Sequence, residues 1–280
     1  MSLRAETAFT NAAGERRDNL EREQRKRFEV VRRLVAAVAE PGEDVLYVAA
    51  ATAPFSTMEF LTTGWILMSL KRCFLVVTDR RLLHVPLSIR GKSKHSIAEV
   101  RYSDVKAIKV EGLLNGFVEL VYPSGKKERF SQLRGYEKKK LVALLDGKAS
   151  PAPVPSQGAA RHFLCPRCAR RWAGEETCPQ CGLRFKNQKL AFWLAVLAPG
   201  GGYFYTNHVW LGIADAFAEV FLLVLLIFGL VALALRDADA LPVLAVAAIG
   251  LTMEKLISVY HVRHYLSEAL PADTTFEPAA

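Results

Sequence analysis

The chain has 280 residues, of which 51% are hydrophobic, and its formal net charge is +9. This length allows two small soluble domains and a membrane part. Residues 1–189 hold 34 Lys and Arg against 20 Asp and Glu, whereas residues 190–280 hold 3 against 8. Such asymmetry favours a soluble part that lies against lipid head groups or nucleic acid, and a domain that is merely basic is the alternative. The first 29 residues are charged and have no apolar core, so we expect no signal peptide and a soluble part in the cytosol.

The N-terminal segment is predicted to be a helix dense in both charges. Residues 1–14 are expected to be disordered, residues 15–40 form the helix, and Pro41 and Gly42 end it. Its apolar positions share one face only in the second half. Two interpretations follow: the arginines lay the helix on anionic lipid, or its C-terminal half packs on the next domain.

Residues 43–147 change to short β-rich runs that are separated by turn residues. The predicted strands are 45–51, 73–78, 82–87, 95–101, 105–111, 117–122 and 127–130, and a helix follows at 133–145.

Seven strands followed by one helix is the element order of a pleckstrin-homology-like (PH-like) barrel. The run from Phe74 to Leu83, with Thr78-Asp-Arg-Arg-Leu82 at its turn, followed by residues 97–110, 117–130 and the helix, resembles bacterial PH-like domains. The resemblance covers about a hundred residues and implies a β-barrel whose loop after the first strand faces ligands or a membrane.

That loop, residues 54–70, is unusually apolar in this chain. Trp65 lies in its apolar part, and Lys71 and Arg72 follow it. The loop can therefore insert into a membrane interface. The alternative is an extra strand or a long hairpin that packs in the core. The candidate residues for lipid or partner binding are Trp65, Lys71, Arg72, Arg80 and Arg81, and the four cations can instead be solvated turn charges.

A segment rich in Pro and Ala, residues 148–161, is predicted to be a linker. After it, Cys165-Pro-Arg-Cys168 and Cys178-Pro-Gln-Cys181-Gly are separated by nine residues. Two such turns together supply four thiolates to one tetrahedral site, which suits Zn²⁺. The pattern resembles zinc ribbons that precede membrane helices in bacterial proteins. We expect structural zinc; an iron site and a redox dithiol pair are the alternatives.

Basic residues surround these cysteines and allow two partners. They are Arg161, Arg167, Arg170, Arg171, Arg184, Lys186 and Lys189. With Trp172 they could contact nucleic acid. Because the membrane segment begins nine residues after Cys181, we favour contact with anionic head groups.

Residues 190–262 contain the only apolar runs long enough to cross a bilayer. Sixteen apolar residues, 220–235, extend back to residue 210 to give 26 residues, about 39 Å of helix at ~1.5 Å per residue, against a hydrocarbon core of roughly 30 Å. Residues 241–262 form a second predicted span. The short apolar run 190–198 ends at Pro199, so it either returns to its own side or begins a kinked span. The Pro199-Gly-x-Gly-x-x-Tyr205 pattern resembles the turn of TM2-type helix pairs.

Four of the polar residues within the predicted spans fall at matching depths. Folding the spans against each other places Asp215 level with His261 and Glu219 level with Lys255, and Asp215 and Glu219 share one helix face. We predict that Glu219 pairs with Lys255, which lowers the cost of both charges in lipid. These side chains reach toward head groups, or Asp215, Glu219 and His261, together with His208, form a proton or ion path.

The sequence therefore predicts a multi-domain α+β membrane protein, with no constellation that supports an enzyme. We expect a basic N-terminal helix (1–41), a PH-like domain (42–148), a linker (149–162), a zinc ribbon (163–187), membrane helices (188–267) and a disordered tail (268–280). The predicted function is non-catalytic: a scaffold anchored in the cell inner membrane, with its soluble parts in the cytoplasm, that binds anionic lipid, a protein partner or a second copy of itself. A tethered nucleic-acid-binding regulator and a small transporter or channel are the alternatives, the first being disfavoured.

Overall fold

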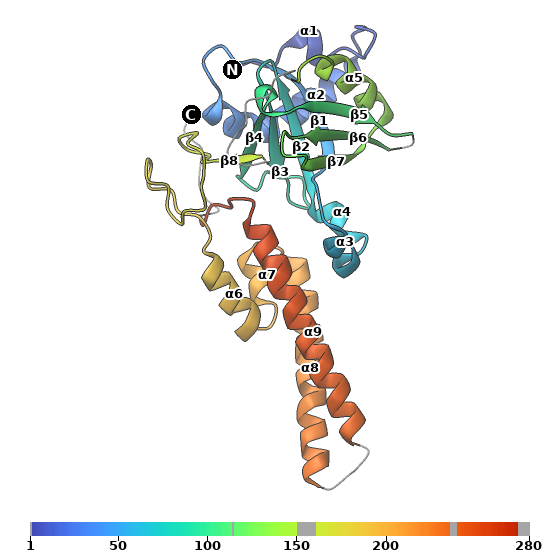
Figure 1. Cartoon of the computed structure of the whole chain (residues 1–280), viewed down its shortest axis with the longest axis vertical. Helices are drawn as coiled ribbons and strands as arrows, with labels where there is room; N and C mark the ends of the chain where they lie inside the picture. The colour runs from blue at the N-terminus through green and yellow to red at the C-terminus, as the bar shows by residue number, and fades with distance from the viewer. Residues whose placement is uncertain (1, 114, 150–160, 236–239, 274–280) are drawn as a thin grey trace. The chain divides into compact units, whose positions relative to one another are not determined.

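A computed structural model describes residues 2–113, 115–149, 161–235 and 240–273 (Figure 1). The chain divides into two compact units, Met1–Phe185 with Ala269–Ala280, and Lys186–Glu268. Most of the expected linker, the expected turn between the two spans and the last seven residues lie outside the described residues.

The first unit is built on an eight-stranded antiparallel sheet in the order β5-β6-β7-β1-β2-β3-β4-β8. The seven strands predicted from sequence are confirmed to within a few residues at each end. The observed strands are β1 (Val45–Thr52), β2 (Arg72–Thr78), β3 (Arg81–Pro86), β4 (Ile97–Arg101), β5 (Ala107–Glu111), β6 (Gly116–Val121), β7 (Lys127–Leu133) and β8 (His162–Leu164).

This sheet is open, whereas the sequence predicts a barrel. Among the described residues β5 and β8 are its two edges, because β4 pairs with β8 and does not pair with β5. The strand β8 was not predicted: three residues are too short to show a period, and their pairing depends on β4.

The central strands β1, β2 and β3 are covered on both faces. Leu75 and Val77 of β2 pack in one core, and Val76 between them packs in the other. Double burial explains why β2 is apolar without the alternation that marks a half-exposed strand. The first core also contains Leu141 and Leu145 of the helix α5 (Gly135–Leu145), as predicted for the helix that closes one end of the sheet.

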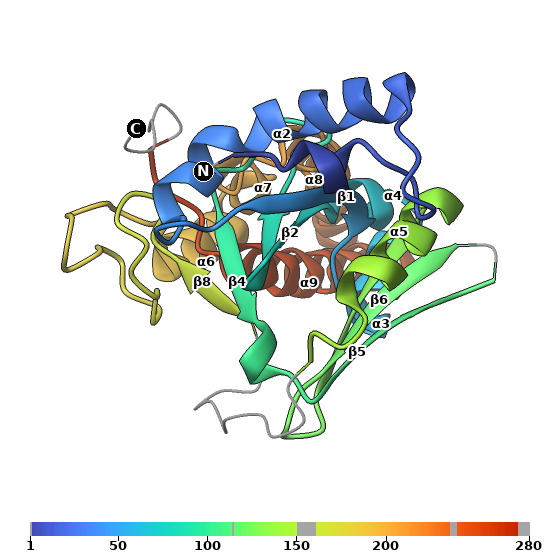
Figure 2. The ribbon, with the colours of Figure 1, turned by 90° about the horizontal axis from the view of Figure 1, so that it is seen from above.

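The helix α2 (Asp18–Val38) covers the opposite face of the sheet (Figure 2). Its second half supplies Val31, Leu34, Val35 and Val38 to the second core, which confirms the packing interpretation. The first half is also anchored, since Arg27 forms a buried ion pair with Glu137 of α5. Because Arg27 and these apolar side chains are buried inside the unit, they do not contact lipid.

The segment before α2 corrects the expected disordered start. It contains a short helix, α1 (Ala5–Ala8), and a bridge between Leu3 and Val45 of β1. Ala8 and Phe9 are buried. The sequence alone does not reveal these contacts, because single apolar residues in a polar segment carry no period.

The second unit consists of helices. These are α6 (Gln188–Leu197), α7 (Gly201–Tyr205), α8 (Val209–Ala234) and α9 (Ala240–Leu266). By length and composition, the helices α8 and α9 are long and apolar enough to cross a membrane. The ten residues of α6 reach only about 15 Å at 1.5 Å per residue.

The chain reverses direction between α6 and α7. Gly200 has a left-handed φ of 66°, and a side chain on Gly202 would collide with Ala195 of α6 and Val262 of α9. The glycines predicted to interrupt the helix therefore allow α7 to pack back on α6. This arrangement favours the returning segment over a kinked span.

Candidate functional site

Four cysteine thiols converge in the first unit. The Sγ atoms of Cys165 and Cys181 are 3.5 Å apart, those of Cys168 and Cys178 are 3.6 Å apart, and all four lie within 4.8 Å of one another. A tetrahedron of sulfurs at ~2.3 Å from a central zinc ion has edges of about 3.8 Å. The cluster therefore fits one four-thiolate metal ion.

The two cysteine loops have the same backbone geometry. In the first, Cys165 N–H donates to Arg170 O and Ala169 N–H donates to Cys165 O; in the second, Cys178 N–H donates to Leu183 O and Gly182 N–H donates to Cys178 O. Both loops then turn through a left-handed residue, with φ of 58° at Ala169 and 71° at Gly182. The sequence offers the preferred glycine in only the second loop.

Backbone N–H groups stabilise negative charge on these sulfurs. Burial raises the pKa of Cys165, although backbone hydrogen bonds from Arg167 and Cys168 oppose this effect. At Cys178 burial also opposes ionisation, but hydrogen bonds from the backbone of Cys181 and Gln180 prevail and lower the pKa to about 7. The loops are therefore suited to thiolate ligands, which metal binding requires.

The cysteine loops pack on the sheet and do not form a separate domain. Strand β8 pairs with β4, and Arg171 Nε lies 3.1 Å from Glu99 Oε1. A small core formed with Leu183 and Phe185 surrounds the cluster. The boundary expected between a PH-like domain and a zinc ribbon therefore falls inside one compact unit.

The C-terminal segment also packs here, which corrects the prediction of a disordered tail for residues 269–273. Pro271 forms a bridge with Phe185, and Ala272 N–H donates to Arg184 O at 2.9 Å. Ala269 is buried against the cysteine cluster.

Several of the basic residues around the cysteines are paired within the unit. Arg161 lies 3.2 Å from Glu128, and Arg170 lies 3.5 Å from Glu175. Together with the pair that Arg171 forms, these contacts reduce the charge available to a nucleic acid.

The candidate lipid-binding residues fall into two groups. Trp65 is 81% exposed and Arg72 is exposed, while Arg80 is half exposed and pairs with Glu40. In contrast, Lys71 is buried against Glu59, with 3.0 Å between Nζ and Oε1.

Arg81 is also buried and is held by two acidic residues. Its guanidinium lies 2.7 Å from Glu43 and 2.5 Å from Glu99, and it donates to the carbonyl oxygen of Val38. Assigning Lys71 and Arg81 to lipid or partner binding is therefore wrong, as is the alternative that they are solvated turn charges. Buried cations of this kind satisfy buried carboxylates.

The segment predicted as an extra strand or a membrane loop forms two short helices, α3 (Thr57–Thr63) and α4 (Ile66–Leu70). Ser56 caps α3, and Glu59 both completes this capping box and pairs with Lys71. Leu67 and Leu70 are buried, which anchors the segment from beneath. The extra-strand interpretation is wrong.

The outer surface of α3 and α4 is apolar. Met58 and Ile66 are each 57% exposed, Leu61 is 73% exposed, and Trp65 is more exposed still. Figure 1 shows both helices projecting from the end of the sheet where β1 finishes and β2 begins. We call these four side chains the apolar edge.

Basic residues border the apolar edge. Arg72 begins β2, and its carbonyl oxygen accepts a hydrogen bond from Leu87 N–H, so the loop after β3 reaches the same end of the sheet. That loop contributes exposed Ile89, Arg90 and Lys92. No Asp or Glu occurs in residues 60–78 or 80–98. These two segments beside the apolar edge therefore carry only positive charge.

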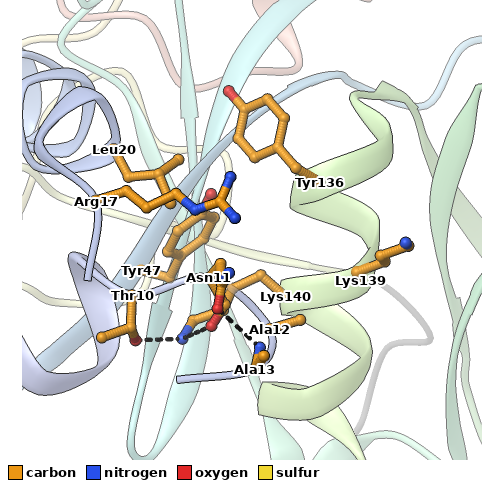
Figure 3. Close-up of a pocket in the computed structure, with 10 residues that line it drawn as sticks. All are labelled: Thr10, Asn11, Ala12, Ala13, Arg17, Leu20, Tyr47, Tyr136, Lys139 and Lys140. Carbon is orange, nitrogen blue, oxygen red and sulfur yellow. Dashed lines mark hydrogen bonds between the residues drawn. The ribbon is translucent and has the colours of Figure 1, made fainter. Parts of the chain in front are cut away.

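A pocket of about 260 Å³ lies between the segment after α1 and the helix α5 (Figure 3). Lys140 Nζ donates to Thr10 Oγ1 and to Asn11 O within it. Its lining contains no Asp, Glu, His, Ser or Cys, so its titratable side chains are those of arginine, tyrosine and lysine residues. The lining residues are Thr10, Asn11, Ala12, Ala13, Arg17, Leu20, Tyr47, Tyr136, Lys139 and Lys140.

In the second unit the predicted partners Glu219 and Lys255 lie together, with 2.6 Å between Oε1 and Nζ. Asp215 accepts a hydrogen bond from Ser258, and His261 contacts Tyr203. The sequence analysis missed three members of this group, Glu254, Ser258 and Tyr203. Glu254 and Ser258 are one turn apart on the same helix, and this spacing was the available signal.

Comparison of the chain with protein-family models, with curated proteins and with solved structures finds no match.

Proposed function

We propose that this protein is a membrane-anchored binding protein whose PH-like first unit docks on anionic lipid through the apolar edge. Its helices α8 and α9 span the membrane, the four cysteines hold a structural zinc ion, and the first unit lies at the cytosolic face. No reaction is assigned to it. The observation that carries the proposal is the apolar edge with its basic border, in a chain that also has two span-length apolar helices.

Exposed apolar side chains of this kind need a partner. Met58, Leu61, Trp65 and Ile66 stand on short helices whose inner faces are held by Leu67, Leu70 and a buried ion pair. Tryptophan is favoured at the boundary between head groups and hydrocarbon, and the cations Arg72, Arg90 and Lys92 suit anionic head groups. Each cation near such a surface contributes about 1 kcal/mol.

Chain connectivity keeps the first unit near the bilayer. The chain passes between the units twice, after Phe185 and before Ala269, and these two crossing points are bridged through Phe185 and Pro271. A tether of this kind converts lipid contact into an intramolecular event with a high effective concentration. Weak attraction of the apolar edge for lipid then suffices for docking.

A zinc ion would be held by Cys165, Cys168, Cys178 and Cys181. It would supply structural crosslinking, because four thiolates leave no open coordination position for a substrate. Its role in the proposal is to fix the loops that join the sheet to the second unit.

The test uses the full-length protein in lipid nanodiscs, with and without phosphatidylserine. Brominated lipid quenches the fluorescence of tryptophan side chains near the hydrocarbon. The fluorescence of Trp65 is obtained as the difference between the wild type and Trp65→Phe. We expect this fluorescence to be quenched in anionic nanodiscs and much less in neutral ones. Leu61→Ser, which leaves the buried anchors in place, should reduce the quenching.

Leu113 provides the matched control, because it is 98% exposed but belongs to the loop between β5 and β6. Leu113→Ser should leave Trp65 quenching unchanged. Trp65 fluorescence that is indifferent to brominated and anionic lipid would contradict the proposal. Salt-sensitive binding of DNA or RNA with greater affinity than heparin would instead support a nucleic-acid-binding regulator.

A further inference from the structure

Three carboxylates lie close together inside the second unit. Oxygens of Asp215, Glu219 and Glu254 are within 4.8 Å of one another. Lys255 is the one cation that contacts them among the described residues, through Glu219 at 2.6 Å and Glu254 at 3.9 Å. With every carboxylate ionised, the group would carry two uncompensated negative charges.

Burial makes that charge excess costly. The side chain of Glu219 is 5% exposed, and its Oε2 is buried without a hydrogen-bond partner in the structure. Glu254 Oε2 is likewise buried without a hydrogen bond. Unpartnered carboxylate oxygens that face other carboxylates require a proton or a cation, since an uncompensated buried charge costs several kcal/mol.

The contacts of Ser258 show where a proton is needed. Its Oγ lies 2.9 Å from Asp215 Oδ1 and 3.0 Å from Glu254 Oε1. A hydroxyl has one proton and can donate to only one of these groups. The other contact is a hydrogen bond only if that carboxyl group is protonated and donates to Ser258. Oxygens of Asp215 and Glu254 also lie within 4.8 Å of each other, so one proton on this pair removes the repulsion between two carboxylates.

A chain of buried polar groups leads away from this pair. Ser258 lies close to Tyr203, and Tyr203 Oη lies 2.7 Å from His261 Nδ1. Ser258, Tyr203 and His261 are each less than 5% exposed. Each of these groups can both donate and accept, so a proton can pass along the chain when their hydrogen bonds reverse.

We propose that Asp215 and Glu254 form a proton-binding site that holds one exchangeable proton, and that Ser258, Tyr203 and His261 relay protons to it. The groups that face the pair are Glu219 from α8, Lys255 from α9 and Tyr203 from α7. From α6 the described contact is the Ala195 carbonyl oxygen, which accepts from Lys255 at 3.1 Å.

The site is distinct from a pore. Residues 220–234 and 240–253 contain no titratable side chain. The fifteen residues 220–234 of α8 therefore form about 22 Å of apolar helix at 1.5 Å per residue beyond Glu219. Protons can reach Asp215 and Glu254 from the end of the helix pair α8 and α9 that lies beside α7. No titratable side chains continue the path along residues 220–234 and 240–253.

A divalent metal fits this cluster less well than a proton. The ammonium group of Lys255 already contacts Glu219 and approaches Glu254, so a metal ion would lie beside a fixed positive charge. A proton between Asp215 and Glu254 avoids that repulsion and accounts for both contacts of Ser258.

The test is infrared spectroscopy of the full-length protein in nanodiscs, with ¹³C label in the Asp and Glu carboxyl groups. A protonated carboxyl group has a carbonyl stretch that is separate from the carboxylate bands. At neutral pH ordinary Asp and Glu, with pKa about 4, are ionised. We expect a protonated carboxyl band in the wild type at neutral pH, and its absence there would overturn the proposal without any variant.

Variants then assign the band. Asp215→Asn and Glu254→Gln should each abolish it, and Ser258→Ala should shift its frequency. Thr252→Val is the control on the same helix, because Thr252 bonds only to the backbone of its own helix in the structure; it should leave the band unchanged. A band that persists in both carboxyl variants overturns the proposal. So does stoichiometric Ca²⁺ or Mn²⁺ binding that removes the wild-type band and is lost in Asp215→Asn.

Discussion

Replacing Arg81 with methionine should destabilise the first unit far more than the same change at its neighbour Arg80. The Arg81 side chain is 4% exposed and pairs with Glu43 and Glu99, which are 0% and 3% exposed. Removing one partner of a buried ion pair costs about 3–5 kcal/mol, because the remaining charge is buried without compensation. For a unit of this size that corresponds to a fall in Tm of roughly 6–20 °C.

The matched variant Arg80→Met removes a surface pair. Arg80 is 45% exposed and contacts Glu40 at 3.1 Å, and such pairs contribute about 0–1 kcal/mol. Thermal unfolding of both full-length variants, followed by circular dichroism of the β-sheet, measures the difference. Zinc content and the helical signal serve as controls for the rest of the chain.

The pH dependence provides a second check on the Arg81 argument. Burial opposes ionisation of Glu43, but hydrogen bonds from Arg81 and from Glu40 N–H prevail and lower its pKa. This lowered pKa stabilises the wild type above about pH 4.3, and the contribution is lost as the pH falls through the folded-state pKa. In Arg81→Met the buried Glu43 should take up a proton more readily, so the destabilisation should shrink between pH 7 and pH 4. Equal effects of Arg81→Met and Arg80→Met at pH 7 would refute the reasoning.

Three further predictions concern the metal centre and a buried histidine. Cys178→Ser should abolish stoichiometric zinc and make the cysteine loops sensitive to protease, since metal binding supplies on the order of 10 kcal/mol of folding free energy to such loops; a zinc-free wild type that resists protease would contradict it. Gly182→Ala should lower the free energy of unfolding by about 1–2 kcal/mol because φ is 71°, whereas Ala169→Gly should not, and denaturant titration of both variants compares them. Burial lowers the pKa of His84, so unfolding should become easier as the pH falls below about 6.5, by up to ~1.4 kcal/mol per pH unit. In His84→Gln the free energy of unfolding, measured by denaturant titration at several pH values, should depend less on pH. An unchanged dependence would exclude His84 as its source.

Contacts among sequence neighbours were predictable. Each strand from β1 to β7 follows from turn residues and runs of β-branched and aromatic residues, and the lengths of α8 and α9 follow from long, mainly apolar runs. The spacing of the two Cys-x-x-Cys turns by itself indicates a cluster of thiols that could hold a metal ion. The Glu219–Lys255 pair follows from counting residues along two predicted spans placed side by side. In these cases the partners are near in sequence, or their depth follows from the regular rise along two adjacent helices.

Whether a charged side chain is buried was decided by tertiary structure. Arg80 and Arg81 are adjacent and chemically identical, yet one is half exposed and the other is buried among Glu43, Glu99 and Val38. Lys71 differs from Arg72 in the same way. Sequence cannot distinguish them, because the carboxylates that fix Arg81 come from segments 38 and 18 residues away.

The remaining features also depend on distant partners. Strand β8 is ordered by pairing with β4, and residues 269–273 are ordered by packing on the cysteine loops. Neither segment has a hydrophobic periodicity that would reveal it in the sequence. Glu254 joins Asp215 and Glu219 only when α8 and α9 pack together. By itself, therefore, the sequence determined the local elements, the thiolate spacing and the span-length helices. The tertiary structure decided which charges are buried and which polar groups meet, because burial and pairing depend on segments that approach only on folding.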